Sequence, residues 1–141
     1  MLMITKHFSL DEFRCGSGKH LCKHCGGSVV PSGDLKKLAE KLEELRTALI
    51  NNFESEVFIY VVSGHRCFLR NADISSCVPH FKSMHTMVAA DIKAKAEGFD
   101  GYVPPKVIYG FADKIFKVGG VGLYKGHVHV DVRSYKARWG V

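Results

Sequence analysis

The stretch GGVGLYKGHVHVDVR, residues 119–133, contains two short β-type runs on either side of Lys125-Gly126. A two-residue turn that ends in glycine typically joins two antiparallel strands, because glycine adopts the backbone conformation that such a turn requires. The stretch therefore predicts a β-hairpin whose strands lie near Val121–Tyr124 and His127–Arg133.

Around this hairpin, helical and strand patterns alternate along the chain. Leucines spaced three or four residues apart between Leu35 and Leu49 predict an amphipathic helix from about Asp34 to Asn51. The other expected elements are a short helix capped by Ser9 with Glu12, strands at Val57–Val62 and Val88–Ile92, a short helix or turn at Phe68–Ile74, and a helix from Pro104-Pro105 to about Val118. This order predicts a single α+β domain over residues 1–141, with a small antiparallel sheet packed against helices.

The composition is that of an ordinary globular domain. Of the 141 residues, 46% are hydrophobic and 24% are charged, which is enough apolar material for a packed core. No apolar run reaches the roughly 18 residues of a membrane span, and Met1–Phe8 is too short an apolar stretch for a secretory signal. We therefore expect a monomer that is made in the cytoplasm without a signal peptide and has no membrane partner.

The net charge of +6 favours an anionic partner. Lysines and arginines are scattered along the chain and form no dense basic run. This distribution argues against nucleic acid as the partner, and it favours a solvated basic surface or attraction to an anionic cell wall.

Eight histidines and five cysteines in so short a chain indicate metal binding, because imidazole and thiolate are the usual zinc ligands. His85, Asp91 and His129 are candidate ligands, since each lies on or beside an expected strand. Two nitrogens and one carboxylate leave a fourth position open for water, as catalytic zinc requires. His127 and Asp131 share a strand face with His129, and a polar face in a buried hairpin is costly unless a partner satisfies it.

Several motifs occur in order along the chain: SGHRC (63–67), the segment around Asn71, SMHTMVAADI (83–92), GGVGLY (119–124) and HVHVDVR (127–133). Together they resemble the zinc D-alanyl-D-alanine carboxypeptidase and L-alanyl-D-glutamate endopeptidase family, which includes phage endolysins and shares its fold with the hedgehog signalling domain. The opening FSLDEFRC (8–15) and the leucine-striped helix resemble the small single-domain members. The resemblance implies a hedgehog-like fold.

The resemblance also implies roles for individual residues. It assigns the zinc ligands to His85, Asp91 and His129. Arg66 corresponds to the family arginine that faces the scissile peptide and stabilises negative charge in the transition state, and Ser83 corresponds to a serine near the substrate. The implied function is zinc-dependent hydrolysis of peptidoglycan stem-peptide bonds, as a carboxypeptidase or an endopeptidase that acts on the cell wall and is encoded by a phage or prophage.

Two positions depart from the family pattern. His85 and Asp91 are six positions apart, where the family usually has seven, and Gly126 stands where many members carry a carboxylate general base. The proton would then be moved by His127 or by Asp131, and Asp131 can instead orient a ligand histidine. The departures also motivate an alternative function, a non-catalytic zinc-binding module of the same fold.

A second cluster lies in a loop rich in glycine, cysteine and histidine. Cys22 and Cys25 form a C-x2-C pair, which is half of a typical zinc site, and Cys15 and one histidine could complete it. The cluster is therefore a candidate site for a second, structural zinc at Cys15, Cys22 and Cys25. The alternatives are free thiols, a disulfide such as Cys67–Cys77, and a nucleic-acid-binding zinc module built on these cysteines.

Overall fold

The computed structural model describes residues 2–15, 33–64 and 88–140. A short 3-10 helix, η1, spans Leu10–Phe13, and the helices α1 and α3 span Gly33–Phe53 and Pro105–Ile115. The strands are β1 (Val57–Ser63), β2 (Ala89–Ala96), β3 (Gly119–Leu123), β4 (Val128–Asp131) and β5 (Lys136–Trp139). The helix or turn predicted at Phe68–Ile74 lies outside the described residues.

The described strands form one sheet with the order β1-β2-β4-β3-β5. Neighbouring strands are antiparallel, except that β5 runs parallel to β3. Strands β3 and β4 form the predicted hairpin, in which Val121 pairs with Val130. Two helices with a mostly antiparallel sheet confirm the predicted α+β class.

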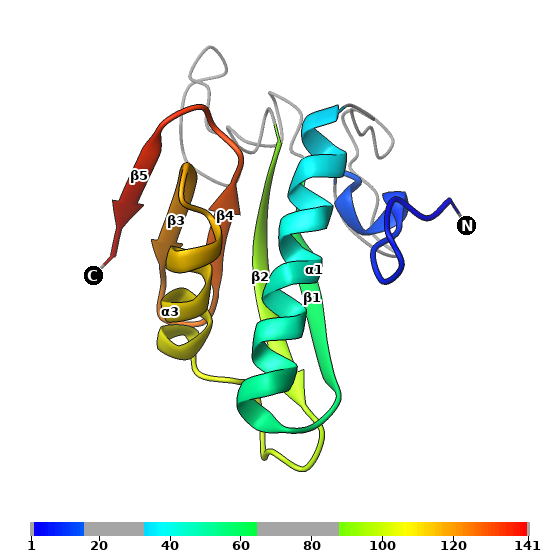
Figure 1. Ribbon diagram of the computed structural model, residues 1–141, viewed down its shortest axis with the longest axis vertical. Coiled ribbons are helices and arrows are strands. Elements are labelled where there is room, and N and C mark those ends of the chain that lie inside the picture. Colours follow the sequence, from blue (N-terminus) through cyan, green and yellow to red (C-terminus); the bar gives the residue numbers. More distant parts are fainter. Residues whose placement is uncertain (1, 16–32, 65–87, 141) are drawn as a thin grey trace.

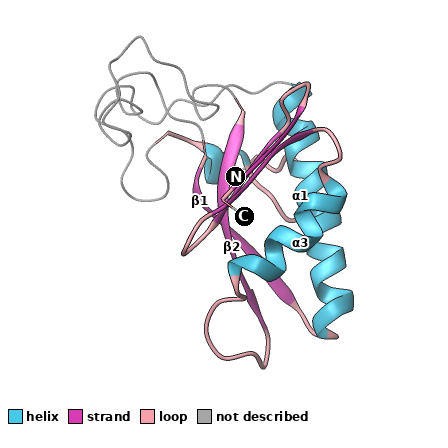
Figure 2. Cartoon of the chain, turned by 90° about the vertical axis from the view of Figure 1, so that its left-hand side faces the viewer, coloured by secondary structure: helices cyan, strands magenta, loops and turns pink. Residues whose placement is uncertain are grey.

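Both helices cover the same face of the sheet (Figures 1 and 2). The predicted leucine stripe is the buried face of α1, and Leu38, Leu42 and Leu45 are fully buried. These side chains belong to one core with apolar residues of the strands, such as Val57 and Ile92. The buried apolar side chains of the strands therefore face α1 and α3. None of the helices in the described ranges combines the length and the apolar character needed to span a bilayer.

The N-terminal segment packs against the end of β1. The Glu12 carboxylate accepts a hydrogen bond from the Ser9 backbone N–H at 2.6 Å, as the predicted capping pattern requires. Phe8 and Phe13 are both buried. A Cβ on Gly64 would lie 2.7 Å from the Phe13 Cα, so only glycine allows the chain after β1 to approach η1 this closely.

Strand β2 extends four residues beyond its predicted end at Ile92. In this extension Ala94 and Ala96 are buried, whereas Lys93 is half-buried and Lys95 is exposed. Alternation of this kind is typical of a strand with one buried face. The small alanines gave a weaker hydrophobic signal than the aliphatic residues before them, which is why the sequence pattern ended the strand too early.

The C-terminal end of α3 and the presence of β5 also differ from what the sequence predicted. Helix α3 ends at Ile115 instead of Val118, because Phe116 has left the helical conformation with φ −88° and ψ 66°. The sequence pattern did not predict β5, whose side chains are exposed or half-buried and show no clear alternation. Its place in the sheet depends on a side chain of the strand, Arg138.

Arg138 fastens β5 to the end of α3. Its guanidinium donates to the Asp113 carboxylate at 2.6 Å, to the Gly119 carbonyl at 2.7 Å and to the carbonyl of Phe116. The last carbonyls of a helix have no partner within the helix, and a cation there also complements the helix dipole. Hydrogen bonding from Arg138 lowers the pKa of Asp113 below its usual range. The arginine therefore satisfies several acceptors at once.

We expect Arg138→Met to lower the free energy of unfolding by about 2 to 3 kcal/mol, because hydrogen bonds from a charged donor contribute more than neutral ones. Urea denaturation measures the change. Lys136→Met is the matched control, because it removes a cation from an exposed position of the same strand. Equal stability of the two variants would contradict a fastening role for Arg138.

Candidate functional site

The pairing of β2 with β4 brings two predicted zinc ligands together. Asp91 lies directly opposite His129 in this antiparallel pair, and both side chains are nearly buried. The Asp91 Oδ1 is 3.3 Å from the His129 Nδ1. Two donor atoms on a tetrahedral zinc ion with bonds of 2.0–2.1 Å lie about 3.3 Å apart. The chemistry and the spacing of this pair therefore fit a zinc ion.

Asp131 holds the other nitrogen of the His129 ring. The distance from His129 Nε2 to Asp131 Oδ2 is 2.7 Å. Asp131 is fully buried, and its carboxylate also accepts hydrogen bonds from the Gly120 N–H at 2.9 Å and from the Arg133 guanidinium at 2.7 Å. Burial alone would raise the pKa of Asp131, but the hydrogen bonds from His129 and Arg133 outweigh it and hold this pKa far below its usual range. Asp131 is therefore an ionised acceptor.

An ionised Asp131 determines how the His129 ring presents its nitrogens. A carboxylate can only accept, so the Nε2 atom carries the proton of their hydrogen bond and the Nδ1 atom faces Asp91. Burial lowers the pKa of His129, but its hydrogen bonds to Asp131 and Asp91 raise this pKa above the ordinary value. The Nδ1 atom thus lies where a positive charge is favoured, as a proton or as a metal ion. Metal-ligating histidines commonly donate their second N–H to a carboxylate in this way.

His127 lies at the accessible edge of the same cluster. Its Nε2 is 3.7 Å from the Asp91 Oδ2, and 31% of its side chain is exposed. The imidazole stacks on the Tyr124 ring with centroids 4.5 Å apart and an interplanar angle of 11°. His127 can therefore exchange protons with solvent, whereas Asp131 is enclosed.

Trp139 lines one side of the site. The sequence analysis did not identify this residue. Its ring centroid is 5.0 Å from that of His129, and its Nε1–H donates to the Tyr124 hydroxyl at 2.9 Å. The indole covers β3 at Gly122, where a Cβ would lie 2.3 Å from the ring. Glycine inside a strand often marks such a close approach, so Gly122 was the available signal.

The structure places four predicted site residues in one cluster: Asp91, His127, His129 and Asp131. Others lie outside the described residues, namely Arg66, Ser83, His85, Cys22 and Cys25. Cys15 is buried at the end of the N-terminal segment. Within the described ranges, no group of three or more His, Cys, Asp or Glu side chains is arranged to hold a metal ion. The described residues thus offer two of the three predicted ligands.

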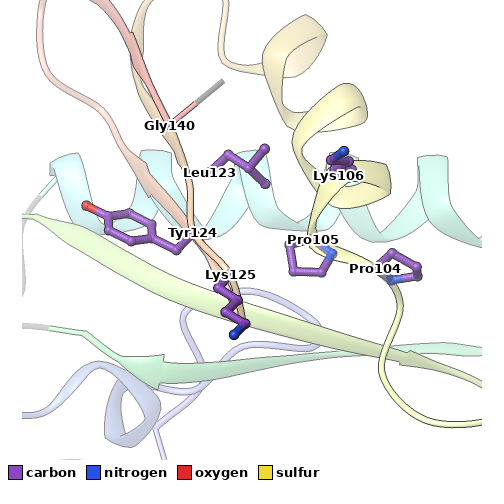
Figure 3. A pocket seen from close by; sticks show the side chains of 7 residues that line it. All are labelled: Pro104, Pro105, Lys106, Leu123, Tyr124, Lys125 and Gly140. Carbon is purple, nitrogen blue, oxygen red and sulfur yellow. The ribbon is translucent and has the colours of Figure 1, made fainter.

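A pocket of about 460 Å³ lies next to the hairpin turn, between the start of α3 and the end of β3 (Figure 3). Pro104, Pro105 and Lys106 line one side of it, and Tyr124 and Lys125 line the other. The Tyr124 ring, which stacks on His127, points away from the two prolines. Asp91, His127, His129 and Asp131 do not line this pocket, so it is separate from the histidine cluster.

No protein-family model, no curated protein and no solved structure matches the chain. The α+β class rests on the structure itself, and the hedgehog-like fold and the zinc-peptidase family remain predictions.

We expect Gly122→Ala to displace the Trp139 indole and to lower the free energy of unfolding by about 1 to 3 kcal/mol, because the new methyl group would overlap the ring. Trp139 is the only tryptophan of the chain, so its fluorescence reports the change directly. The emission should shift to longer wavelength and be quenched more strongly by iodide.

Gly126→Ala serves as the control, since a Cβ at that position meets no atom within 4 Å. Identical emission spectra for both alanine variants would show that the indole does not cover Gly122.

Proposed function

We propose that the protein is a zinc-dependent peptidase that hydrolyses stem-peptide bonds of peptidoglycan, as a carboxypeptidase or an endopeptidase. The observation that carries the proposal is the Asp91–His129 pair, whose donor atoms are 3.3 Å apart while the buried Asp131 holds the far side of the imidazole. The motifs that resemble the zinc carboxypeptidase family support the substrate class.

A structural role for the cluster is the simplest competing explanation, because buried histidines are often held by hydrogen bonds. Here, however, one imidazole lies between two carboxylates, those of Asp91 and Asp131, and a second imidazole, that of His127, also faces Asp91. Burying several polar groups in this way is costly. A cation between Asp91 and the two rings would offset that cost, and this favours a metal site over a purely structural network.

Each residue of the cluster would have a distinct role in catalysis. Asp91 and His129 hold the metal with His85, and Asp131 fixes the ring of His129. Zinc bound there would polarise the scissile carbonyl and acidify a water molecule. His127 is the residue that we propose to move the proton, because its imidazole is both beside Asp91 and partly exposed.

The remaining roles rest on the family resemblance alone. Arg66 would stabilise negative charge on the scissile peptide, and Ser83 would contact the substrate. A second, structural zinc would involve Cys15, Cys22 and Cys25. The net charge of +6 would concentrate the protein on an anionic cell wall, where a phage or prophage lysis enzyme acts.

A second candidate function is a non-catalytic zinc-binding module of the same fold. Gly126 favours it, since many family members place their general base at this position and glycine has no side chain to serve. The module and the peptidase share the metal site, and they differ in whether cell walls are cut.

We expect His129→Ala to lose both the zinc at the main site and the hydrolysis of purified cell walls, because it removes one of three ligands. Metal analysis gives zinc per chain, and newly released amino groups report hydrolysis, with and without a chelator. Full activity and full zinc content in this variant would rule out His129 as a ligand. Wild-type protein that binds zinc and releases no amino groups would favour the non-catalytic module.

A pair of variants distinguishes the two candidates for proton transfer, His127 and Asp131. His127→Ala should keep its zinc and lose about 10²- to 10⁴-fold in turnover, as expected for the loss of a general acid or base. Asp131→Asn should weaken zinc binding by about 10- to 100-fold, because the amide no longer orients the His129 ring. The reverse pattern would assign proton transfer to Asp131.

A further inference from the structure

The helices cover one face of the sheet (Figure 2). On the opposite face, β1 and β2 carry aromatic and basic side chains that are exposed or half-buried. On β1, Phe58 and Tyr60 are exposed to 52% and 44%. The register places them directly opposite Lys95 and Lys93 of β2. Opposed residues of an antiparallel pair share a face, so these four side chains form one surface.

The two lysines converge on one aromatic ring. The ammonium of Lys93 lies 4.9 Å from the Tyr102 ring centroid, and that of Lys95 lies 4.8 Å from it. Among the residues that the structure describes, neither ammonium forms an ion pair with a carboxylate. Two like charges held over the same ring repel each other, and a bound anion would relieve this repulsion.

This lysine pair is aligned with the metal site along a single strand. Asp91, Lys93 and Lys95 are alternate residues of β2 and therefore lie on the same face. At 3.2–3.4 Å per residue, Lys93 stands roughly 7 Å and Lys95 roughly 13 Å from Asp91 along the strand. An extended peptide has nearly the same rise. A carboxylate about two to four residues from a peptide bond at the Asp91–His129 pair would therefore reach the lysines.

We propose that Lys93 and Lys95, held over Tyr102, form a carboxylate-binding subsite for an acidic peptide that extends along β2 from the metal site. The inference rests on the proposed function, and it narrows the substrate to peptides that carry a free carboxylate near the bond that is cut. Phe58 and Tyr60 supply apolar contact beside the two charges. A nucleic acid fits less well, since the surface offers two cations instead of a continuous basic track.

Two synthetic stem pentapeptides test the subsite. One contains D-glutamate with a free α-carboxylate, and the other contains D-isoglutamine, in which an amide replaces that carboxylate. Their affinities for the full chain are measured in short calorimetric titrations, and the mass of the peptide is checked afterwards. We expect the acidic peptide to bind about tenfold more tightly, which corresponds to about 1.4 kcal/mol, and the preference to fall with added salt.

Matched variants then test whether Lys93 and Lys95 cause the preference for the acidic peptide. Lys93→Gln with Lys95→Gln should abolish the tenfold preference and leave the affinity for the amidated peptide nearly unchanged. Lys36→Gln with Lys37→Gln removes the same charge from exposed positions of α1 and should keep the preference. Tyr102→Phe retains the ring and should also keep it, whereas Tyr102→Ala should reduce it.

The proposal fails if the wild-type chain binds both peptides equally or binds neither. It also fails if both double-lysine variants lose the preference to the same extent, because the effect would then reflect net charge alone. The titrations do not depend on hydrolysis. A chain that prefers the acidic peptide but cuts no cell wall would therefore overturn the peptidase and leave the subsite intact.

Discussion

The buried carboxylate of Asp131 is the interaction on which the rest of the site depends. It accepts hydrogen bonds from the backbone of β3 at Gly120, from the Arg133 side chain and from the His129 ring. A buried charge is stable only when such partners surround it. By satisfying this charge, the hairpin β3–β4 also fixes the imidazole that faces Asp91 on β2. The contacts that hold Asp131 in the hairpin therefore also orient His129, the candidate metal ligand.

The glycines of β3 make this arrangement sterically possible. A Cβ on Gly120 would lie 2.4 Å from the Asp131 carboxylate, and one on Gly122 would overlap the Trp139 indole. A side chain at Gly120 would therefore displace the carboxylate that orients His129, and one at Gly122 would displace the indole beside it. Arg138 also holds Trp139 in place. Its hydrogen bonds connect β5, the strand that carries Trp139, to the end of α3.

The sequence predicted those parts of the fold that have a strong local pattern. The leucine repeat located α1, and Lys125-Gly126 located the turn between β3 and β4. The pairing of β2 with β4 has no local signal, because register between strands distant in the chain is set by tertiary packing. The approach of Asp91 to His129 was therefore expected from their chemistry as zinc ligands and from the family resemblance, and not from any predicted strand pairing. Trp139 was missed because its contact with Gly122 joins two separate strands.

We propose that His129 binds zinc through Nδ1 while its Nε2 keeps the proton that it donates to Asp131. Nitrogen-15 NMR of the histidine rings during a zinc titration distinguishes the two nitrogens of His129. We expect one equivalent of zinc to shift the His129 Nδ1 resonance, while the Nε2 proton persists and exchanges slowly with solvent because of its hydrogen bond to Asp131. An unchanged His129 ring, or loss of the Nε2 proton on zinc binding, would contradict it.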